Sequence, residues 1–234
     1  MPRPHAASAD HLGVALPYFP VVGLLLGALL VALDLALRAL LAPVVVDALL
    51  VGALVVLSGA LHLDGLVDTC DAVCTSTTPE ARLALMHDSR AHDAGTVAAC
   101  LLLLGKFAAL QALPGAARLP ALLLAPLLAR WAIVVAYWGY PYARRTPGAS
   151  LALKRQATTP RLLAATAAAL VALGLGVGLA GPLVLAATGL AIHLAASFVR
   201  TRLPGLTGDT YGAIAELVEA LALILVPLAL GGYA

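Results

Sequence analysis

Three aspartates with helical spacing stand out in a chain that carries few charges. Asp64, Asp68 and Asp71 lie at positions i, i+4 and i+7, so on an α-helix, at about 100° per residue, their side chains point within roughly 60° of one another. Carboxylates crowded in this way repel one another and resist burial. Hard oxygen ligands suit Mg²⁺, which takes its remaining ligands from water and substrate phosphate. We interpret this aspartate stripe as a metal site; its alternative is a solvated face balanced by Arg82 and Arg90.

A second polar cluster follows at residues 86–90. Pro79 is expected to begin a short helix that leads into it, because proline is favoured at the first helical position. Arg90 presents a planar guanidinium that can hold a phosphate oxygen through two hydrogen bonds. Asp88 offers an acceptor that can orient or deprotonate a hydroxyl. We predict that both are catalytic residues, with an ion pair inside this hairpin as the alternative.

The third polar segment precedes the last apolar stretch. Thr207, Gly208 and Asp209 stand where a helix is expected to begin, and the free N–H groups of a helix N-terminus attract anions. We predict Thr207 and Gly208 as substrate-binding residues and Asp209 as a catalytic residue; a structural turn is the alternative for the glycines. Glu216 and Glu219 follow on one face of the same helix. Because an acid inside a bilayer suggests a function, Glu216 is predicted to bind substrate.

Two further residues complete the predicted binding site. Gly65 follows the first aspartate directly, and a residue without a side chain lets a phosphate approach the backbone. Arg144 belongs to a basic and aromatic segment, residues 139–160, which could attract an anionic substrate. Membrane topology alone would also explain the charge of that segment.

The composition indicates which elements must position these residues. Of the 234 residues, 62% are hydrophobic and 11% charged, and the mean hydropathy of +1.00 is typical of membrane proteins. Long Leu and Ala runs without period-two alternation favour helices over a barrel. We predict an all-α integral membrane helix bundle, one domain over residues 1–234, with about seven spans. The expected spans are 17–37, 43–63, 93–113, 120–138, 161–180, 183–200 and 213–231.

The distribution of basic residues predicts the orientation. With a cytoplasmic N-terminus, ten of the fourteen Lys and Arg residues fall in cytoplasmic segments, as the positive-inside rule requires. All the polar clusters then lie on the cytoplasmic face. Lys106 and Arg130 fall inside spans, where each must either face a partner or extend to the surface. Asp34 and Arg38, four residues apart, are expected to pair or to extend to the surface. The net charge of +2, with 5% aromatic residues, gives no indication of nucleic-acid binding.

Three segments together resemble the cobalamin synthase family: L-H-L-D-G-L-V-D-T-C-D at 61–71, L-M-H-D-S-R at 85–90 and L-T-G-D-T-Y-G-A-I-A-E-L-V-E at 206–219. The F-P-V-V-G opening and the P-Y-A-R sequence at 141–144 also match, so the resemblance covers most of the chain. The chain departs from the family pattern at Ala72, where glycine is usual, and at His87, where lysine is frequent. All the acidic residues of the pattern are present.

The resemblance implies a Mg²⁺-dependent adenosylcobinamide-GDP ribazoletransferase of the cell inner membrane. In that reaction the hydroxyl of α-ribazole, or of its 5′-phosphate, attacks the cobinamide-linked phosphorus of adenosylcobinamide-GDP, and GMP leaves. Phosphoryl-type transfer requires mainly positioning and charge neutralisation, which would fall to Mg²⁺ on the aspartate stripe and to Arg90. Asp88 or Asp209 would orient the attacking hydroxyl. Besides substrates and lipid, a homo-oligomer or association with other cobalamin-assembly enzymes stays open.

A CDP-alcohol phosphotransferase and a membrane transporter are the alternatives to this function. CDP-alcohol phosphotransferases also carry an aspartate-rich membrane helix, but Val67-Asp68 stands where their pattern needs Ala-Arg. A transporter would use Lys106, Arg130 and Glu216 to line a path, and would be expected to show inverted repeats or broken helices. No convincing repeat relates the two halves of the sequence.

Overall fold

The protein is built from helices. The computed structural model describes residues 12–75, 77–86, 93–144 and 148–232, and every regular element in these ranges is helical. The elements are η1 (Leu12–Tyr18), α2 (Phe19–Arg38), α3 (Pro43–Leu57), α4 (Leu61–Thr75), α5 (Pro79–Leu85), α6 (Asp93–Gln111), α7 (Gly115–Gly139), α8 (Ala149–Arg155), α9 (Thr159–Val177), η2 (Gly178–Ala180), α10 (Gly181–Arg200) and α11 (Gly208–Ala229). The predicted all-α class is confirmed.

Several helices have the length and composition of membrane spans. Five described helical segments pass this test, and the bent pair α3 and α4 adds a sixth if it counts as one span. The longest segment, Thr159–Arg200, contains both α9 and α10. These two helices meet at Gly178, whose φ is +62°, and pack against each other. Counted separately, α9 and α10 match two of the seven predicted spans.

One predicted span, residues 43–63, is wrong. α3 ends at Leu57 and α4 begins at Leu61, at 84° to it. Between them Gly59 and Ala60 both have positive φ, +64° and +58°, a conformation that costs alanine roughly 1 kcal/mol or more. The break gives the aspartate stripe a helix of its own, α4, which packs against α11 and α6.

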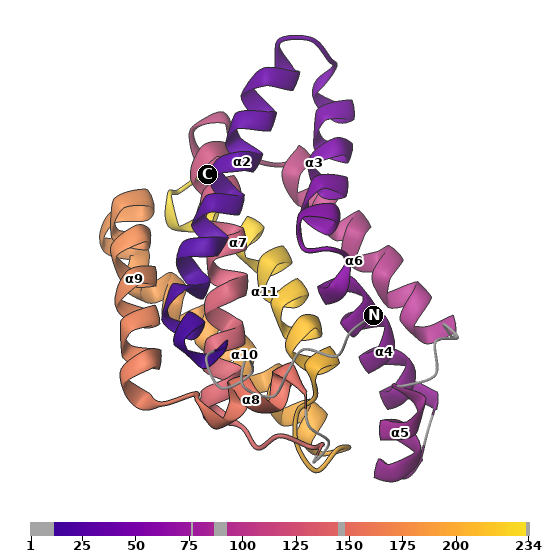
Figure 1. Cartoon of the computed structure of the whole chain (residues 1–234). Helices are drawn as coiled ribbons and strands as arrows, with labels where there is room; N and C mark the ends of the chain where they lie inside the picture. The colour runs from indigo at the N-terminus through magenta and orange to yellow at the C-terminus, as the bar shows by residue number, and fades with distance from the viewer. Residues whose placement is uncertain (1–11, 76, 87–92, 145–147, 233–234) are drawn as a thin grey trace.

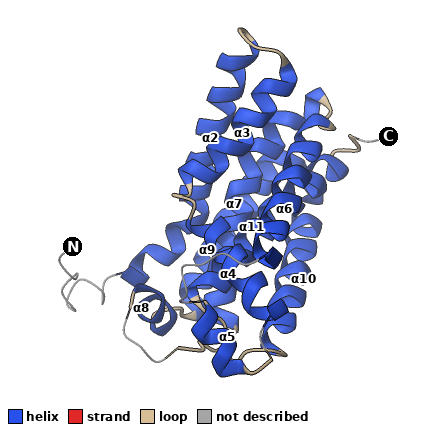
Figure 2. Ribbon diagram, turned by 90° about the vertical axis from the view of Figure 1, so that its right-hand side faces the viewer, coloured by secondary structure: helices blue, strands red, loops and turns tan. Residues whose placement is uncertain are grey.

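The centre of the bundle is formed by α7 and α11. α7 contacts α2 on one side and α11 on another, and seventeen of its residues are buried. Figure 1 shows α9 on one side of this pair and α3, α4 and α6 on the other, and α10 packs against α7, α9 and α11. Gly23 and Gly27 let α2 approach so closely that a side chain at either position would collide with the α7 backbone, as is common in membrane bundles. The short helices α5 and α8 lie at the same end of the bundle (Figure 2).

The C-terminal part of α2 carries a cluster of paired charges. Arg38 Nε pairs with Asp34 at 3.0 Å, as predicted, and Arg38 also reaches Asp47 of α3 at 3.1 Å. Buried Arg118 of α7 binds both of these aspartates. The cluster therefore joins α2, α3 and α7 and satisfies its charges internally.

Candidate active site

The first and third predicted segments meet where α4 crosses the start of α11. A Cβ atom added to Gly65 would lie 2.5 Å from the Asp209 carbonyl oxygen, and one added to Gly212 would lie 3.0 Å from the His62 Cα atom. The two backbones touch because both crossing points are glycines. Gly65 thus has a packing role, and α11 fills the room that the sequence predicted for a phosphate.

The basic segment is fixed to the same place by backbone hydrogen bonds. Ala143 N–H donates to the Leu206 carbonyl and Leu206 N–H donates to the Pro141 carbonyl, each at 2.8 Å. A side chain at Gly205 would collide with this segment, since its Cβ atom would lie 2.5 Å from the Pro141 oxygen. The pairing delivers Arg144, whose Nη2 lies 3.1 Å from Asp209 Oδ2.

The start of α11 is a well-formed helix cap. Thr207 accepts a hydrogen bond from Thr210 N–H at 3.3 Å, and the Thr210 hydroxyl lies 2.7 Å from Thr207 N–H, which satisfies two end groups reciprocally. The Thr207 hydroxyl also lies 3.2 Å from Asp209 Oδ2 and 3.6 Å from Met86 Sδ. Met86, the first residue of the second predicted segment, therefore contacts the cap. The predicted catalytic residues Asp88 and Arg90 themselves lie outside the described residues.

The aspartate stripe does not form a uniform set. Asp64 is exposed and Asp68 half-buried, whereas Asp71 is 3% exposed and accepts a 2.6 Å hydrogen bond from Gly95 N–H. Asp71 thus holds the first turn of α6 against α4. Within the described residues, no three His, Cys, Asp or Glu side chains are arranged as a metal-binding group. The aspartates are therefore not a preformed three-ligand cage.

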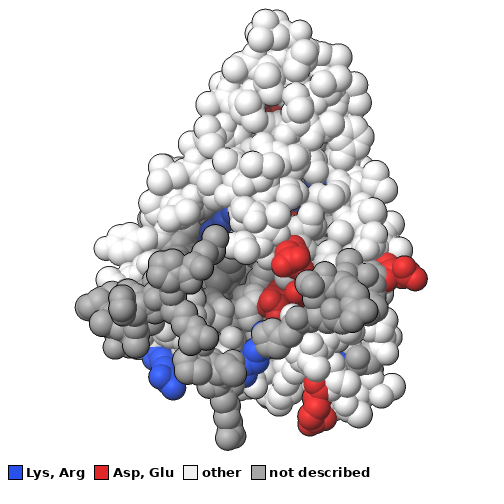
Figure 3. Space-filling model, turned by 45° about the vertical axis from the view of Figure 1, so that its right-hand side comes forward, with Lys and Arg blue, Asp and Glu red and all other residues white. Residues whose placement is uncertain are grey.

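Asp68 nevertheless lies in a strongly acidic setting. Asp64, Asp71 and Asp209 all act electrostatically on it, and Arg144 opposes them. Figure 3 shows charged side chains gathered in the lower half of one face, while the upper half is almost free of them. Mg²⁺ is usually held by one or two protein carboxylates, with water and substrate phosphate completing its shell. The accessible pair Asp64 and Asp68 has the donor chemistry for such a site.

Glu216, predicted to bind substrate, belongs to a buried ion-pair network. Lys106 Nζ lies 2.6 Å from Glu216 Oε2 and 2.7 Å from Glu219 Oε1, and Arg130 Nη1 lies 2.8 Å from Glu219 Oε2. All four side chains are at most 8% exposed. Lys106 and Arg130 therefore face partners and do not extend to the surface. Their position inside spans was the signal for partners, but helical spacing does not reveal which helices face each other.

Sequence reasoning missed a cluster of tyrosines beside the cap. The rings of Tyr142 and Tyr211 are stacked, with a centroid distance of 6.3 Å and an interplanar angle of 7°. The Tyr137 ring also contacts Tyr211, with a centroid distance of 3.9 Å. Burial raises the pKa of the Tyr142 phenol above its ordinary value, although the hydrogen bond from Ser150 and the nearby Arg144 oppose this rise. Tyr142 thus remains a neutral hydrogen-bonding group. Only its place within P-Y-A-R could have indicated this role.

The short helix α8 is tied to the C-terminal end of α7. Lys154 Nζ donates to the carbonyl oxygens of Tyr137 at 2.6 Å and Trp138 at 3.3 Å, the position at which a cation best offsets the helix dipole. Burial lowers the pKa of Lys154 below its ordinary value. The tyrosine cluster and α8 together fix the path of the chain into Arg144.

Fold and site define a class of protein: a polytopic membrane protein whose acidic helix, basic segment and capped helix start converge at one end of the bundle. The chain belongs to the cobalamin-5-phosphate synthase family, whose model matches residues 1–227.

Curated relatives agree with this assignment. The chain is 36% identical to a protein of Desulforamulus reducens over 95% of its length and 89% of the relative. It is 41% identical to one of Stutzerimonas stutzeri, over 94% and 89%, and 40% identical to one of Pseudomonas paraeruginosa, over 97% and 90%. Each relative is named adenosylcobinamide-GDP ribazoletransferase. No solved structure matches the chain.

Proposed function

We propose that the protein transfers the adenosylcobinamide-phosphate group of adenosylcobinamide-GDP to α-ribazole or its 5′-phosphate and releases GMP. Family membership and the shared name of the relatives support this reaction. The observation that carries it in this chain is the meeting of Asp68, Asp209 and Arg144 at one end of a membrane bundle. Acidic groups that can share a cation and a guanidinium that can bind phosphate suit phosphoryl-type transfer.

Each bond change has a place in this site. The acceptor hydroxyl oxygen bonds to the cobinamide-linked phosphorus, while the bond from that phosphorus to the bridging oxygen breaks and GMP leaves with the electron pair. Asp209, oriented by Arg144 and Thr207, accepts the hydroxyl proton or holds the hydroxyl in line. Asp88 has the alternative claim to this role, and Arg90 steadies a nonbridging oxygen.

Mg²⁺ is part of the proposal. Asp64 and Asp68 would hold the ion, and Asp71 adds negative charge from its buried position against Gly95. When bound, the ion would neutralise negative charge on the diphosphate. Because two carboxylates leave room for phosphate ligands, this arrangement fits an ion that binds together with its substrate.

The remaining contacts to substrate come from the surrounding elements. Arg144, Thr207 and Gly208 border the acidic groups and would contact the phosphates, while Gly65 and Glu216 act through packing and ion pairing instead. We place the protein in the inner membrane with this end on the cytoplasmic side, because the positive-inside rule assigns the basic connections there.

The transporter alternative is not favoured. The charges expected to line its path, those of Lys106, Arg130 and Glu216, are buried in pairs with one another or with Glu219. The CDP-alcohol phosphotransferase alternative still lacks its Ala-Arg positions.

One assay separates the three functions. Purified protein in lipid nanodiscs is incubated with adenosylcobinamide-GDP, α-ribazole and Mg²⁺, and released GMP is measured by chromatography. GMP release that requires all three components supports the proposed function. GMP release without ribazole, or no release at all, contradicts it.

A further inference from the structure

A pocket lies between α2, α7 and the junction of α3 with α4. It measures about 230 Å³ and is lined by residues of α2, α7 and the break between α3 and α4. The lining residues are Phe19, Val22, Leu26, Leu57, Ser58, His62, Arg130 and Ile133. Since a water molecule in the liquid takes up roughly 30 Å³, the pocket has space for a ligand of a few ring atoms or for several waters.

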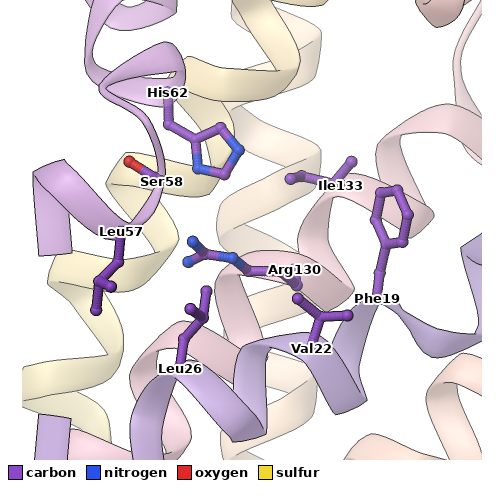
Figure 4. Close-up of a pocket in the computed structure, with 8 residues that line it drawn as sticks. All are labelled: Phe19, Val22, Leu26, Leu57, Ser58, His62, Arg130 and Ile133. Atoms are coloured by element: carbon purple, nitrogen blue, oxygen red, sulfur yellow. The ribbon is translucent and has the colours of Figure 1, made fainter. Parts of the chain in front are cut away.

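The polar floor of the pocket has hydrogen-bonding capacity to spare. Arg130 is 6% exposed and directs its Nη1 to Glu219, but a guanidinium carries five N–H donors. Within the described residues, neither its other nitrogens nor the His62 ring has a hydrogen-bond partner. Figure 4 shows the Arg130 guanidinium and the His62 ring directed toward each other across the pocket. Unused donors inside a membrane bundle are costly, so an acceptor is expected there.

The charge balance around Arg130 restricts that acceptor. Two cations, Lys106 and Arg130, face two carboxylates, Glu216 and Glu219, in the network behind the pocket. A further anion would be an uncompensated charge in a setting of low dielectric constant. The walls formed by Phe19 and the aliphatic side chains favour an apolar body. The expected ligand is therefore uncharged and apolar, with a hydrogen-bond acceptor at one end.

We propose that this pocket is a second binding site, which takes an uncharged apolar group bearing a hydrogen-bond acceptor for Arg130 and His62. Two kinds of molecule that carry such a group have access to the protein. One is the benzimidazole base that α-ribazole carries, an assignment that rests on the proposed function. The other is the ester carbonyl of a phospholipid, which would enter between the spanning helices.

Paired tryptophan variants test the proposal without touching the charged residues. Leu26→Trp and Leu57→Trp fill the pocket from two different helices. Leu25→Trp and Val56→Trp are matched controls at neighbouring positions, because Leu25 is 65% and Val56 75% exposed and neither lines the pocket. A shared loss in Leu26→Trp and Leu57→Trp then reports the pocket and not one misfolded helix.

The first measurement is the binding of benzimidazole to delipidated protein in detergent, which ligand-observed NMR detects. The second is the amount of phospholipid that co-purifies with each variant, measured by mass spectrometry. Binding weakened at least tenfold in both pocket variants, but not in the controls, identifies the base. Phospholipid lost from the same two variants alone identifies the lipid. If the four variants match the wild type in both measurements, or if the wild type retains neither ligand, the proposal is overturned.

The GMP assay keeps this proposal separate from the proposed function. If the wild-type protein releases GMP, but the pocket variants keep their benzimidazole and lipid binding and Leu26→Trp keeps its KM for α-ribazole, the pocket proposal is refuted. The proposed function then stays intact. If the wild-type protein releases no GMP, but phospholipid is lost from Leu26→Trp and Leu57→Trp alone, the proposed function is refuted and the pocket proposal is supported.

Discussion

Two groups of charged residues in this protein, each made of acidic and basic side chains, differ in burial and in charge balance. Inside the bundle, Lys106 and Arg130 are matched with two glutamates at distances of 2.6 to 2.8 Å, and all four are buried. At the end of the bundle, Arg144 pairs with Asp209 and acts electrostatically on Asp68, while Asp64 adds further negative charge, and all three aspartates reach the surface in part.

The difference separates a structural role from a catalytic one. A matched, desolvated network has no charge left for a ligand, and removing one partner is strongly destabilising because an uncompensated charge then stays buried. A cluster with surplus negative charge and solvent access is destabilising by itself, so it is expected where a cation and a phosphate are bound. Substitutions in the two groups should therefore affect different properties of the protein.

The largest effect is expected at the end of the bundle. Asp64→Ala and Asp68→Ala should each lower kcat for GMP release by roughly 10²- to 10³-fold or more, because they remove charge that acts on the transition state. Thermal unfolding in detergent should stay near that of the wild type. Glu80→Ala is the control, since Glu80 is an exposed acid on α5 at the same end. Near-normal turnover in either aspartate variant would rule out the proposed metal role.

The buried network should respond in stability. Lys106→Met leaves Glu216 and Glu219 short of a partner and should lower the free energy of unfolding by about 3–5 kcal/mol. The measurement is the denaturation midpoint in detergent, with Arg155→Met as the control because Arg155 is exposed. An unchanged midpoint in Lys106→Met would show that the network does not stabilise the bundle.

Arg144 belongs to the end of the bundle and should show an intermediate effect. Arg144→Ala removes the guanidinium proposed to contact the phosphates; since a hydrogen bond to a charged group is worth roughly 1.5–3 kcal/mol, KM for adenosylcobinamide-GDP should rise about ten- to a hundredfold. Arg202→Ala serves as the comparison, since Arg202 stacks on Phe198 at 3.8 Å. Equal kinetics in the two variants would refute a substrate role for Arg144.

The smallest effect concerns packing between α4 and α11. Gly65→Ala places a Cβ atom 2.5 Å from the Asp209 carbonyl oxygen and should cost about 1–3 kcal/mol of stability. At Gly52 of α3 nothing lies within 4 Å of an added Cβ atom, so Gly52→Ala should be neutral or stabilising. Unfolding midpoints measure both, and a shift of the same size and sign in both variants would contradict the close contact.

The helices and the one-sided arrangement of the polar segments were predictable because they depend on local hydrophobicity and charge. The break at Gly59 and Ala60 was not, since the apolar run continues through it and only tertiary packing selects the positive φ of Ala60. The packing contacts of Gly65 and Asp71 were not predicted, for a related reason. Spacing along one helix shows which side chains share a face, but not that the backbones of α11 and α6 occupy that face.

The central claim is that catalysis belongs to the end of the bundle and stability to the buried network. Its most direct test is GMP release at saturating substrates, measured per folded molecule for Asp68→Asn and Lys106→Met side by side. The account predicts almost no GMP from Asp68→Asn and near wild-type release from the folded fraction of Lys106→Met. Active Asp68→Asn together with folded but inactive Lys106→Met would contradict it.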